Sequence, residues 1–331
     1  NDTLVDDYLD ARESHFRVLV LQFIQMIGFK VLVTAGLLLI GGLLVLEQQM
    51  NIGQFVAAEI IILLVISSVE KLILGLETFY DLLTSLEKMG QVVDKELEPQ
   101  DGETPFKENE GLTVELEDIV HKMPGLDKKI IDHLSLTIKP ETKLLIQGKS
   151  GSGRSTLLRM IAGILEPDEG KIYVNNVALK GIKLSQYRSY LGHSLTEEYP
   201  FEGTLLDNIT FGNKDISMED VYWALEKVSL SEFVKEQPQG LKTILYPEGK
   251  KFPDFISRKI VLARSIVTRP KLMVLKDPLE QYDEEETERM MDFLTDPANG
   301  WALVVVSENP KWAKRCNQVI RMEKGRLINV N

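Results

Sequence analysis

The sequence predicts two parts: an α-helical transmembrane hairpin that continues as a cytosolic stalk, followed by an α/β domain built around a phosphate-binding loop. Two observations carry this prediction. Two apolar runs stand close together near the N-terminus, and a glycine-rich loop further along lies between a short apolar run and a helical pattern. A length of 331 residues agrees with about two domains.

The composition excludes some classes of partner and site. A net charge of -12 argues against nucleic acid, whose binding depends on clustered Lys and Arg. The single cysteine, Cys316, excludes an intramolecular disulfide and a cysteine-based zinc cluster. The chain starts at Asn1 and shows no signal-peptide pattern ahead of its first apolar run, so we expect it to be a fragment of a longer protein.

The first apolar run, 18–46, carries Lys30 as its only formal charge over about 29 residues, which is enough to cross a bilayer. Gly36, Gly41 and Gly42 would weaken a soluble helix. Glycine is frequent in membrane helices, where it permits close packing. The alternative is a buried helix of a soluble protein.

The second apolar run, 55–69, is interrupted by Glu59 and is marginal by itself. It is interpreted as the return helix, because the polar turn before it lacks Lys and Arg and both ends of the hairpin are then expected in the cytosol. The basic residues on the opposite side are Arg12, Arg17, Lys71 and Lys88. Lys30 and Glu59 would be costly against lipid, so we expect them inside the bundle or beside water, as a structural pair, a helix-end snorkel or part of a substrate path.

Three segments follow from this pattern. Apolar residues continue at helical spacing beyond the second run, so residues 1–98 are assigned to the hairpin and its stalk. Residues 99–111 contain Pro, Gly and many acids but few apolar side chains, which is typical of a linker. Residues 112–331 form the second domain.

A glycine-rich loop, GKSGSGRST at 148–156, follows the short apolar run KLLIQ and precedes the helical pattern LLRMIAGIL. In a phosphate-binding loop, glycines turn backbone N–H groups toward phosphates, a Lys reaches the outer phosphates and a hydroxyl ligates Mg²⁺. Here Arg154 replaces the Lys, and Ser155 supplies the hydroxyl as the predicted metal ligand. The predicted nucleotide-binding residues of the loop are Gly148, Ser150, Gly151, Gly153, Arg154, Ser155 and Thr156.

The chain resembles the ABC transporter family over nearly all of 112–330, on the stretches GSGRSTLLRMIAGILEPDEGKIYVNN, FEGTLLDNITFG and IVLARSIVTRPKLMVLKDP. The hairpin with its stalk resembles the last two transmembrane helices of a type I exporter half, and FEGTLLDNI is similar to peptide and toxin exporters. The resemblance implies an α/β P-loop NTPase-type ABC cassette, ATP and Mg²⁺ as cofactors, and a dimer of two transporter halves.

The resemblance also marks where this sequence departs from the family. Met123 stands where the family has the aromatic residue that stacks on adenine, so adenine affinity should be lower. Thr196 stands at the glutamine that senses Mg²⁺. Residues 252–256, FPDFI, replace the LSGGQ signature loop, so the serine and glycines that embrace phosphate across the dimer are missing.

The remaining departures concern catalysis. Lys276 replaces the metal-binding Asp at the end of KLMVL, and Asp277 replaces the catalytic Glu with a side chain one methylene shorter. Glu308 replaces the switch histidine and brings a negative charge toward the γ-phosphate. Asp277 and Glu308 are thus the catalytic positions by resemblance, both eroded. Asp283 keeps the family's dimer-contact aspartate.

We therefore predict an exporter half subunit with a degenerate cassette, weak ATP binding, little use of Mg²⁺ and little or no hydrolysis. It would be an integral protein of the bacterial inner membrane, with the cassette on the cytoplasmic side, acting structurally or regulatorily in a homodimer or heterodimer. An export system of this kind would add a periplasmic adaptor. The alternative is an active ATP-hydrolysing exporter of peptides, toxins or other substrates, in which Arg154, Ser155 and Asp277 sustain slow turnover. A soluble P-loop enzyme would leave the hairpin and its charge asymmetry unexplained.

Overall fold

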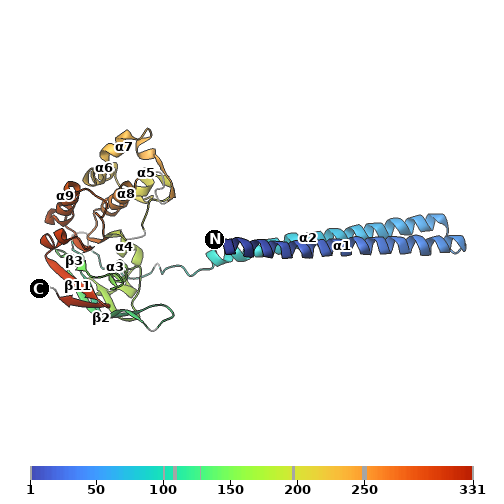
Figure 1. Cartoon of the computed structure of the whole chain (residues 1–331), viewed down its shortest axis with the longest axis horizontal. Coiled ribbons are helices and arrows are strands. Elements are labelled where there is room, and N and C mark those ends of the chain that lie inside the picture. Colours follow the sequence, from blue (N-terminus) through green and yellow to red (C-terminus); the bar gives the residue numbers. More distant parts are fainter. Residues whose placement is uncertain are drawn as a thin grey trace. The chain divides into compact units, whose positions relative to one another are not determined.

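The computed structural model describes residues 2–99, 101–106, 110–126, 128–195, 198–247 and 252–329. It divides into two compact units, Asn1–Leu97 and Glu98–Asn331, each of which is described by itself. The predicted order, two long apolar helices followed by an α/β domain, is confirmed (Figure 1).

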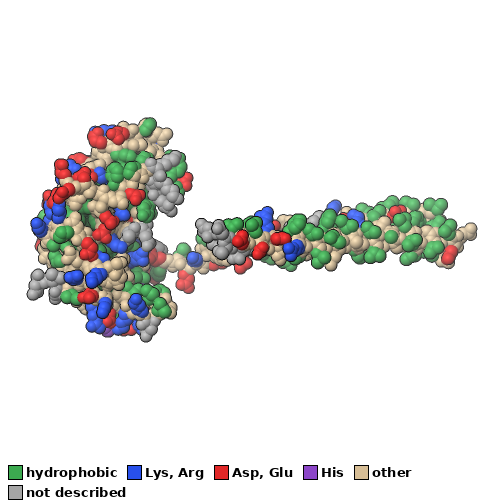
Figure 2. Space-filling view, viewed as in Figure 1, with side chains coloured by type: hydrophobic (Ala, Val, Ile, Leu, Met, Phe, Trp, Pro, Cys, Tyr) green, Lys and Arg blue, Asp and Glu red, His purple; other side chains and the backbone are tan. Residues whose placement is uncertain are grey.

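The first unit is a hairpin of two long helices, α1 (Asp2–Leu46) and α2 (Ile52–Val93). Asn51 ends the turn between them and caps α2, because its side chain accepts from the Gln54 N–H while the Gln54 side chain accepts from the Asn51 N–H. Each helix is long and apolar enough to cross a membrane by length and composition. Hydrophobic side chains cover much of the visible face of the hairpin, and charged ones gather toward the end that carries the chain terminus (Figure 2).

Two contacts fix the antiparallel pairing of α1 and α2. Gly41 lies so close to the Phe55 ring that an added Cβ would come within 2.4 Å of its Cε2 atom. At a second point, Lys30 Nζ lies 3.0 Å from a carboxylate oxygen of Glu70. Lys30 therefore pairs with the acid that ends the second apolar run and not with Glu59, because the pairing of the helices places positions 30 and 70 opposite one another.

The second unit contains three sheets. A six-stranded sheet has the order β12-β11-β3-β10-β9-β6, a four-stranded antiparallel sheet has the order β2-β1-β4-β5, and β7 pairs with β8. The strands are β1 (Val114–Lys122), β2 (Lys129–Ile138), β3 (Lys143–Gln147), β4 (Glu169–Val174), β5 (Val177–Ala178), β6 (Leu191–Ser194), β7 (Gly203–Thr204), β8 (Ile244–Leu245), β9 (Leu272–Lys276), β10 (Ala302–Val306), β11 (Gln318–Glu323) and β12 (Arg326–Asn329). In the largest sheet only β12 runs antiparallel to its neighbour.

Helices cover both faces of the six-stranded sheet. They are α3 (Arg154–Ile161), α4 (Leu184–Ser189), α5 (Leu205–Thr210), α6 (Met218–Lys227), α7 (Ser231–Glu236), α8 (Asp254–Ile266) and α9 (Glu284–Thr295), with short 3-10 turns η1 (Leu179–Gly181), η2 (Gly240–Lys242), η4 (Pro297–Asn299) and η5 (Pro310–Lys314). In Figure 1, α5, α6, α7 and α8 lie together at one end of this unit, away from β2 and β11.

The central parallel strands are buried on both faces, which is why their sequences are continuous apolar runs. Alternate residues of β3 enter different cores: Leu144 and Ile146 belong to the cluster with α3, whereas Leu145 belongs to the cluster with α5, α6 and α8. The same alternation holds along β9 and β10. Both faces are thus filled, and the loops at the carboxyl ends of β3, β9 and β10 remain to form a site.

Part of the segment expected to be a linker is docked on the second unit. Glu98 forms two hydrogen bonds of 2.8 Å with the Arg188 guanidinium, and Glu103 bridges to Ile182. The Phe106 ring lies against the rings of Tyr187 and Tyr190, with centroid distances of 6.4 and 4.9 Å. One aromatic side chain anchors a stretch whose composition is otherwise polar.

Candidate functional site

The glycine loop connects β3 to α3 through backbone conformations that favour glycine. Gly148 has φ +150° and Gly153 has φ +102°. A Cβ at Gly148 would lie 2.4 Å from the Met322 carbonyl oxygen, and one at Gly153 would lie 2.7 Å from the Ile130 carbonyl oxygen. A side chain at either position would therefore push the loop away from the strands beneath it.

The start of α3 offers an anion-binding end. Its first residues are Arg154, Ser155 and Thr156, all half-buried, and the first N–H groups of a helix have no partner within the helix. The Ser152 hydroxyl is buried and has no hydrogen-bond partner among the described residues. The loop backbone and this helix end therefore fit the phosphate chain of a nucleotide.

The cation of this loop is already engaged by a carboxylate. Arg154 Nη1 lies 2.5 Å from Glu308 Oε1, and the same oxygen is 3.4 Å from the Gly148 N–H. The Arg154 side chain is 13% exposed, whereas that of Glu308 is 64% exposed. The residue at the switch position thus reaches into the phosphate loop from the end of β10 and neutralises its positive charge.

Asp277 follows β9 with a left-handed backbone of φ +41° and donates its N–H to the Val306 carbonyl at 2.8 Å. Burial raises the pKa of Asp277 above the ordinary value of a carboxylic acid, although a hydrogen bond with Ser307 and the charges of Arg154 and Lys276 act in the opposite direction. Asp277 is therefore a partly desolvated carboxyl group close to the loop cation.

The donor set suits phosphate better than a metal ion. Magnesium prefers carboxylate, hydroxyl and water oxygens in an octahedral arrangement. The end of β9 offers one carboxyl group, Asp277, directly beside the ammonium-bearing Lys276, and the start of α3 offers the Ser155 hydroxyl. An ammonium next to the carboxyl group opposes a divalent cation, so these residues fit Mg²⁺ poorly.

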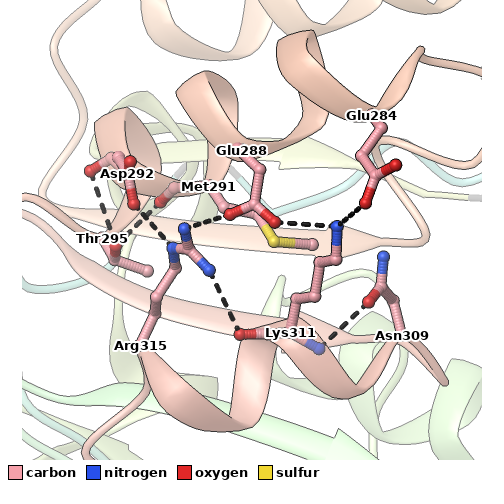
Figure 3. A network of polar contacts seen from close by, with 8 residues as sticks. All are labelled: Glu284, Glu288, Met291, Asp292, Thr295, Asn309, Lys311 and Arg315. Atoms are coloured by element: carbon pink, nitrogen blue, oxygen red, sulfur yellow. Dashed lines mark hydrogen bonds and ion pairs between the residues drawn. The ribbon is translucent and has the colours of Figure 1, made fainter.

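The loop that carries Glu308 is held from behind by α9. Lys311 donates its N–H to the Asn309 side chain, and its ammonium lies 2.7 Å from Glu284 and 2.8 Å from Glu288 (Figure 3). Arg315 pairs with Glu288 and with Asp292 in the same network. The hydrogen bonds from Lys311 and then Arg315 lower the pKa of Glu288. The segment after Glu308 is therefore tied to α9 by several charges at once.

Asp283 has a local structural role. Its side chain accepts a hydrogen bond of 2.7 Å from the Glu286 N–H and so caps the first turn of α9. The sequence pattern D-x-x-E at this place is a sufficient signal for such a cap. An aspartate at this position is thus explained by the helix alone, whatever contact it makes in a dimer.

The segment in place of the signature loop leads into α8. Phe252 packs edge to face against Phe233, with ring centroids 5.3 Å apart, and Asp254 is the first residue of α8. The side chain of Phe255 is 40% exposed. Instead of a phosphate-binding turn, this stretch presents a carboxylate and aromatic rings.

A buried ion pair behind this segment was not anticipated from the sequence. Lys259 Nζ on α8 lies 2.5 Å from Glu286 Oε1 on α9, and the two side chains are 7% and 10% exposed. The ammonium also lies 5.6 Å from the Phe255 ring centroid and 5.3 Å from that of Tyr282. The only available signal was a lysine inside the apolar run of ISRKIVL, and its partner could not be identified.

The other predicted site residues lie elsewhere. Met123 stands just after β1, donates its N–H to the Lys128 carbonyl and is 37% exposed. Thr196 falls outside the described residues. The structure thus brings Arg154, Glu308 and Gly148 into contact, with Asp277 close by, while Met123 belongs to the turn between β1 and β2.

Comparisons with known proteins decide the family. The family model described as "ABC transporter" matches residues 131–280. The chain is 24% identical over 316 residues to the alpha-hemolysin translocation ATP-binding protein HlyB of Escherichia coli, an alignment that covers 95% of this chain and 45% of that protein. The chain is a distant homologue of the ABC transporter ATP-binding proteins of type I exporters.

Further relatives agree with this assignment. The transport/processing ATP-binding protein ComA of Streptococcus pneumoniae serotype 4 is 25% identical over 312 residues, covering 90% of this chain and 41% of that protein. The fold matches that of a bacterial Atm1-family ABC exporter solved with ATP bound, with a TM-score of 0.66 at 20% identity, over 75% of this chain and 43% of that one. The chain spans less than half the length of these relatives. The second unit is therefore an ABC cassette, and its family binds ATP.

Proposed function

We propose that this chain is part of an exporter half whose ABC cassette binds nucleotide weakly and hydrolyses it little or not at all. In this proposal residues 1–98 are the membrane hairpin and stalk, 99–111 the connection and 112–331 the cassette. The contact between Arg154 and Glu308 carries the proposal, because it engages the only side-chain cation of the phosphate loop's helix start with an internal carboxylate.

The phosphate-binding residues have different roles. Gly148, Gly151 and Gly153 let the loop backbone approach phosphates, and the N-terminus of α3 favours their negative charge. Bound ATP would supply the phosphoryl group for any reaction. The side-chain positions proposed to contact it are Met123, Ser150, Arg154, Ser155 and Thr156.

Hydrolysis requires oriented water, metal and charge stabilisation together. Lys276 stands where a metal-binding carboxylate is expected, and Glu308 adds a negative charge at the loop. The segment at 252–256 presents Asp254 and aromatic rings where an opposing cassette would need a phosphate-binding loop. Each change removes one of the joint requirements, and their combination supports a structural or regulatory role.

The proposal extends to the membrane and to partners. The two apolar helices of the first unit would lie in a bacterial inner membrane with the cassette in the cytoplasm. The partner is a second transporter half, identical or different, and a periplasmic adaptor would complete an export system.

An active exporter ATPase is the second candidate, and one observation favours it. Asp277 keeps a carboxyl group beside Arg154, and its raised pKa suits a proton acceptor better than a fully solvated carboxylate would. Slow turnover would then survive despite the other changes.

Calorimetric titration of the full chain in nanodiscs with ATP, with and without Mg²⁺, tests the proposed site. We expect weak binding with nearly the same dissociation constant in both conditions, because Lys276 opposes the metal ion. A Lys276→Asp variant should make binding depend on Mg²⁺. Tight, strictly Mg²⁺-dependent binding by the unmodified chain would contradict the proposal.

A further inference from the structure

Glu308 occupies a particular part of the nucleotide site. Its Oε1 atom accepts from Arg154 Nη1 at 2.5 Å and lies 3.4 Å from the Gly148 N–H. The first of these is a short, charge-assisted hydrogen bond, and the second is a long contact at the limit of a hydrogen bond. The carboxylate is thus held mainly by the guanidinium, at the edge of the glycine loop.

The cation at this position of a phosphate loop faces the outer phosphates. The loop's N–H groups cradle the α- and β-phosphates, while the side-chain cation reaches the β- and γ-phosphates. An anion bound to Arg154 therefore competes most directly with the terminal phosphate of a triphosphate. A diphosphate leaves that place to the carboxylate and keeps the backbone cradle.

The placement of Glu308 is fixed by its neighbours on both sides. Ser307 before it is buried, and its hydroxyl accepts from the Asn309 N–H at 3.2 Å. Asn309 is in turn tied through Lys311 to the acidic side chains of α9 (Figure 3). Because this loop is anchored in two places, the carboxylate is directed at Arg154 by the fold and not by the ion pair alone.

We propose that Glu308 is a specificity-determining residue that makes this site prefer a nucleoside diphosphate to a triphosphate. The inference rests on the nucleotide site of the proposed function and adds the class of ligand. A γ-phosphate must displace the carboxylate from Arg154 or lie beside an uncompensated negative charge. The β-phosphate, held by the backbone of 151–155, meets neither obstacle.

Competition binding on the full chain in nanodiscs tests the preference. ADP and ATP, each with Mg²⁺, displace a fluorescent ADP analogue from the unmodified chain and from Glu308→Gln, which keeps the shape but removes the charge. We expect the unmodified chain to bind ADP more tightly than ATP. In Glu308→Gln, ATP affinity should rise by at least about tenfold with little change for ADP, since a charge-assisted hydrogen bond to Arg154 is released.

Two further variants control the comparison. Glu226→Gln removes the same charge from an exposed position on α6, and both nucleotide affinities should stay at their original values. Glu308→Ala should repeat the gain for ATP, which separates the loss of charge from any new contact of glutamine. Tryptophan fluorescence during urea unfolding checks that every variant is folded.

Equal changes for ADP and ATP in Glu308→Gln, or no change for either, would overturn the inference. The same is true of an unmodified chain that prefers ATP. Either result leaves the proposed lack of hydrolysis standing, because that is measured separately as phosphate release. Conversely, hydrolysis by the unmodified chain would contradict the proposed function even where the preference for diphosphate is observed.

Discussion

The Arg154 guanidinium and the Glu308 carboxylate stand 154 positions apart in the sequence and meet at the phosphate loop. Each change alone weakens a nucleotide site: arginine is bulkier and more planar than an ammonium, and glutamate repels phosphate. Together they neutralise each other. The pair shows how a loop can keep its backbone form while its cation serves an internal partner.

The buried pair of Lys259 and Glu286 allows a prediction at the residue scale. Lys259→Met leaves the Glu286 carboxylate buried without its partner, so the cassette should lose about 3–5 kcal/mol of unfolding free energy. The double variant Lys259→Met, Glu286→Leu should recover most of this loss, because no unpaired charge remains.

Urea unfolding of the full chain followed by tryptophan fluorescence measures this effect. The three tryptophans, Trp223, Trp301 and Trp312, all belong to the second unit, so the signal reports on the cassette. Lys235→Met, which breaks the exposed pair of Lys235 with Glu232, is the matched control and should cost little. An unchanged midpoint for Lys259→Met would show that this ion pair does not stabilise the cassette.

At the scale of single elements, much of the fold could be predicted. The glycine loop between the β3 and α3 patterns, the apolar runs of β9 and β10 and the two long helices are local signals, and local signals can be read from one sequence. Partners across the fold could not be predicted, as Lys30 with Glu70, Lys259 with Glu286 and Arg154 with Glu308 show. Composition also concealed the docked ring of Phe106, because a single aromatic hardly changes the average of a polar segment.

The hairpin of α1 and α2 carries a prediction about topology. Its turn lacks Lys and Arg, whereas basic residues flank the other ends, so Asn51 should face the outside of the cytoplasmic membrane. An impermeant maleimide added to intact cells should therefore label Asn51→Cys. The single native thiol is a weak competitor, because burial raises the pKa of Cys316 to about 12.

A Cys316→Ser background removes the remaining ambiguity in this experiment. Lys88→Cys in the same background is a matched control on the opposite end of α2 and should be labelled only after the cells are opened. Labelling of Asn51→Cys only from the cytosolic side would reverse the proposed orientation.

At the scale of the whole molecule, the family resemblance implies composite sites, each joining the phosphate loop of one cassette to the signature loop of the other. This chain departs from the family in both. Restoring Arg154→Lys, Lys276→Asp, Asp277→Glu and Glu308→His should therefore not create turnover in a homodimer. Rebuilding LSGGQ at 252–256 as well should be required, because the opposing half of each site is otherwise still incomplete.

Phosphate release by these variants in nanodiscs measures this requirement. The variant with a rebuilt signature loop but an unmodified phosphate loop is the matched control and should also stay inactive. Turnover in either partly restored variant would mean that the two halves of the composite site are not both needed.

The most direct measurement for the nucleotide site is phosphate release from ATP by the unmodified full chain, compared with its Asp277→Asn and Ser155→Ala variants. The three proteins should release phosphate at the same background rate, with and without Mg²⁺, because the loop cation is paired with Glu308 and the metal position holds Lys276. Substantial Mg²⁺-dependent release by the unmodified chain that is abolished in either variant would contradict the degenerate cassette and establish an active transport ATPase.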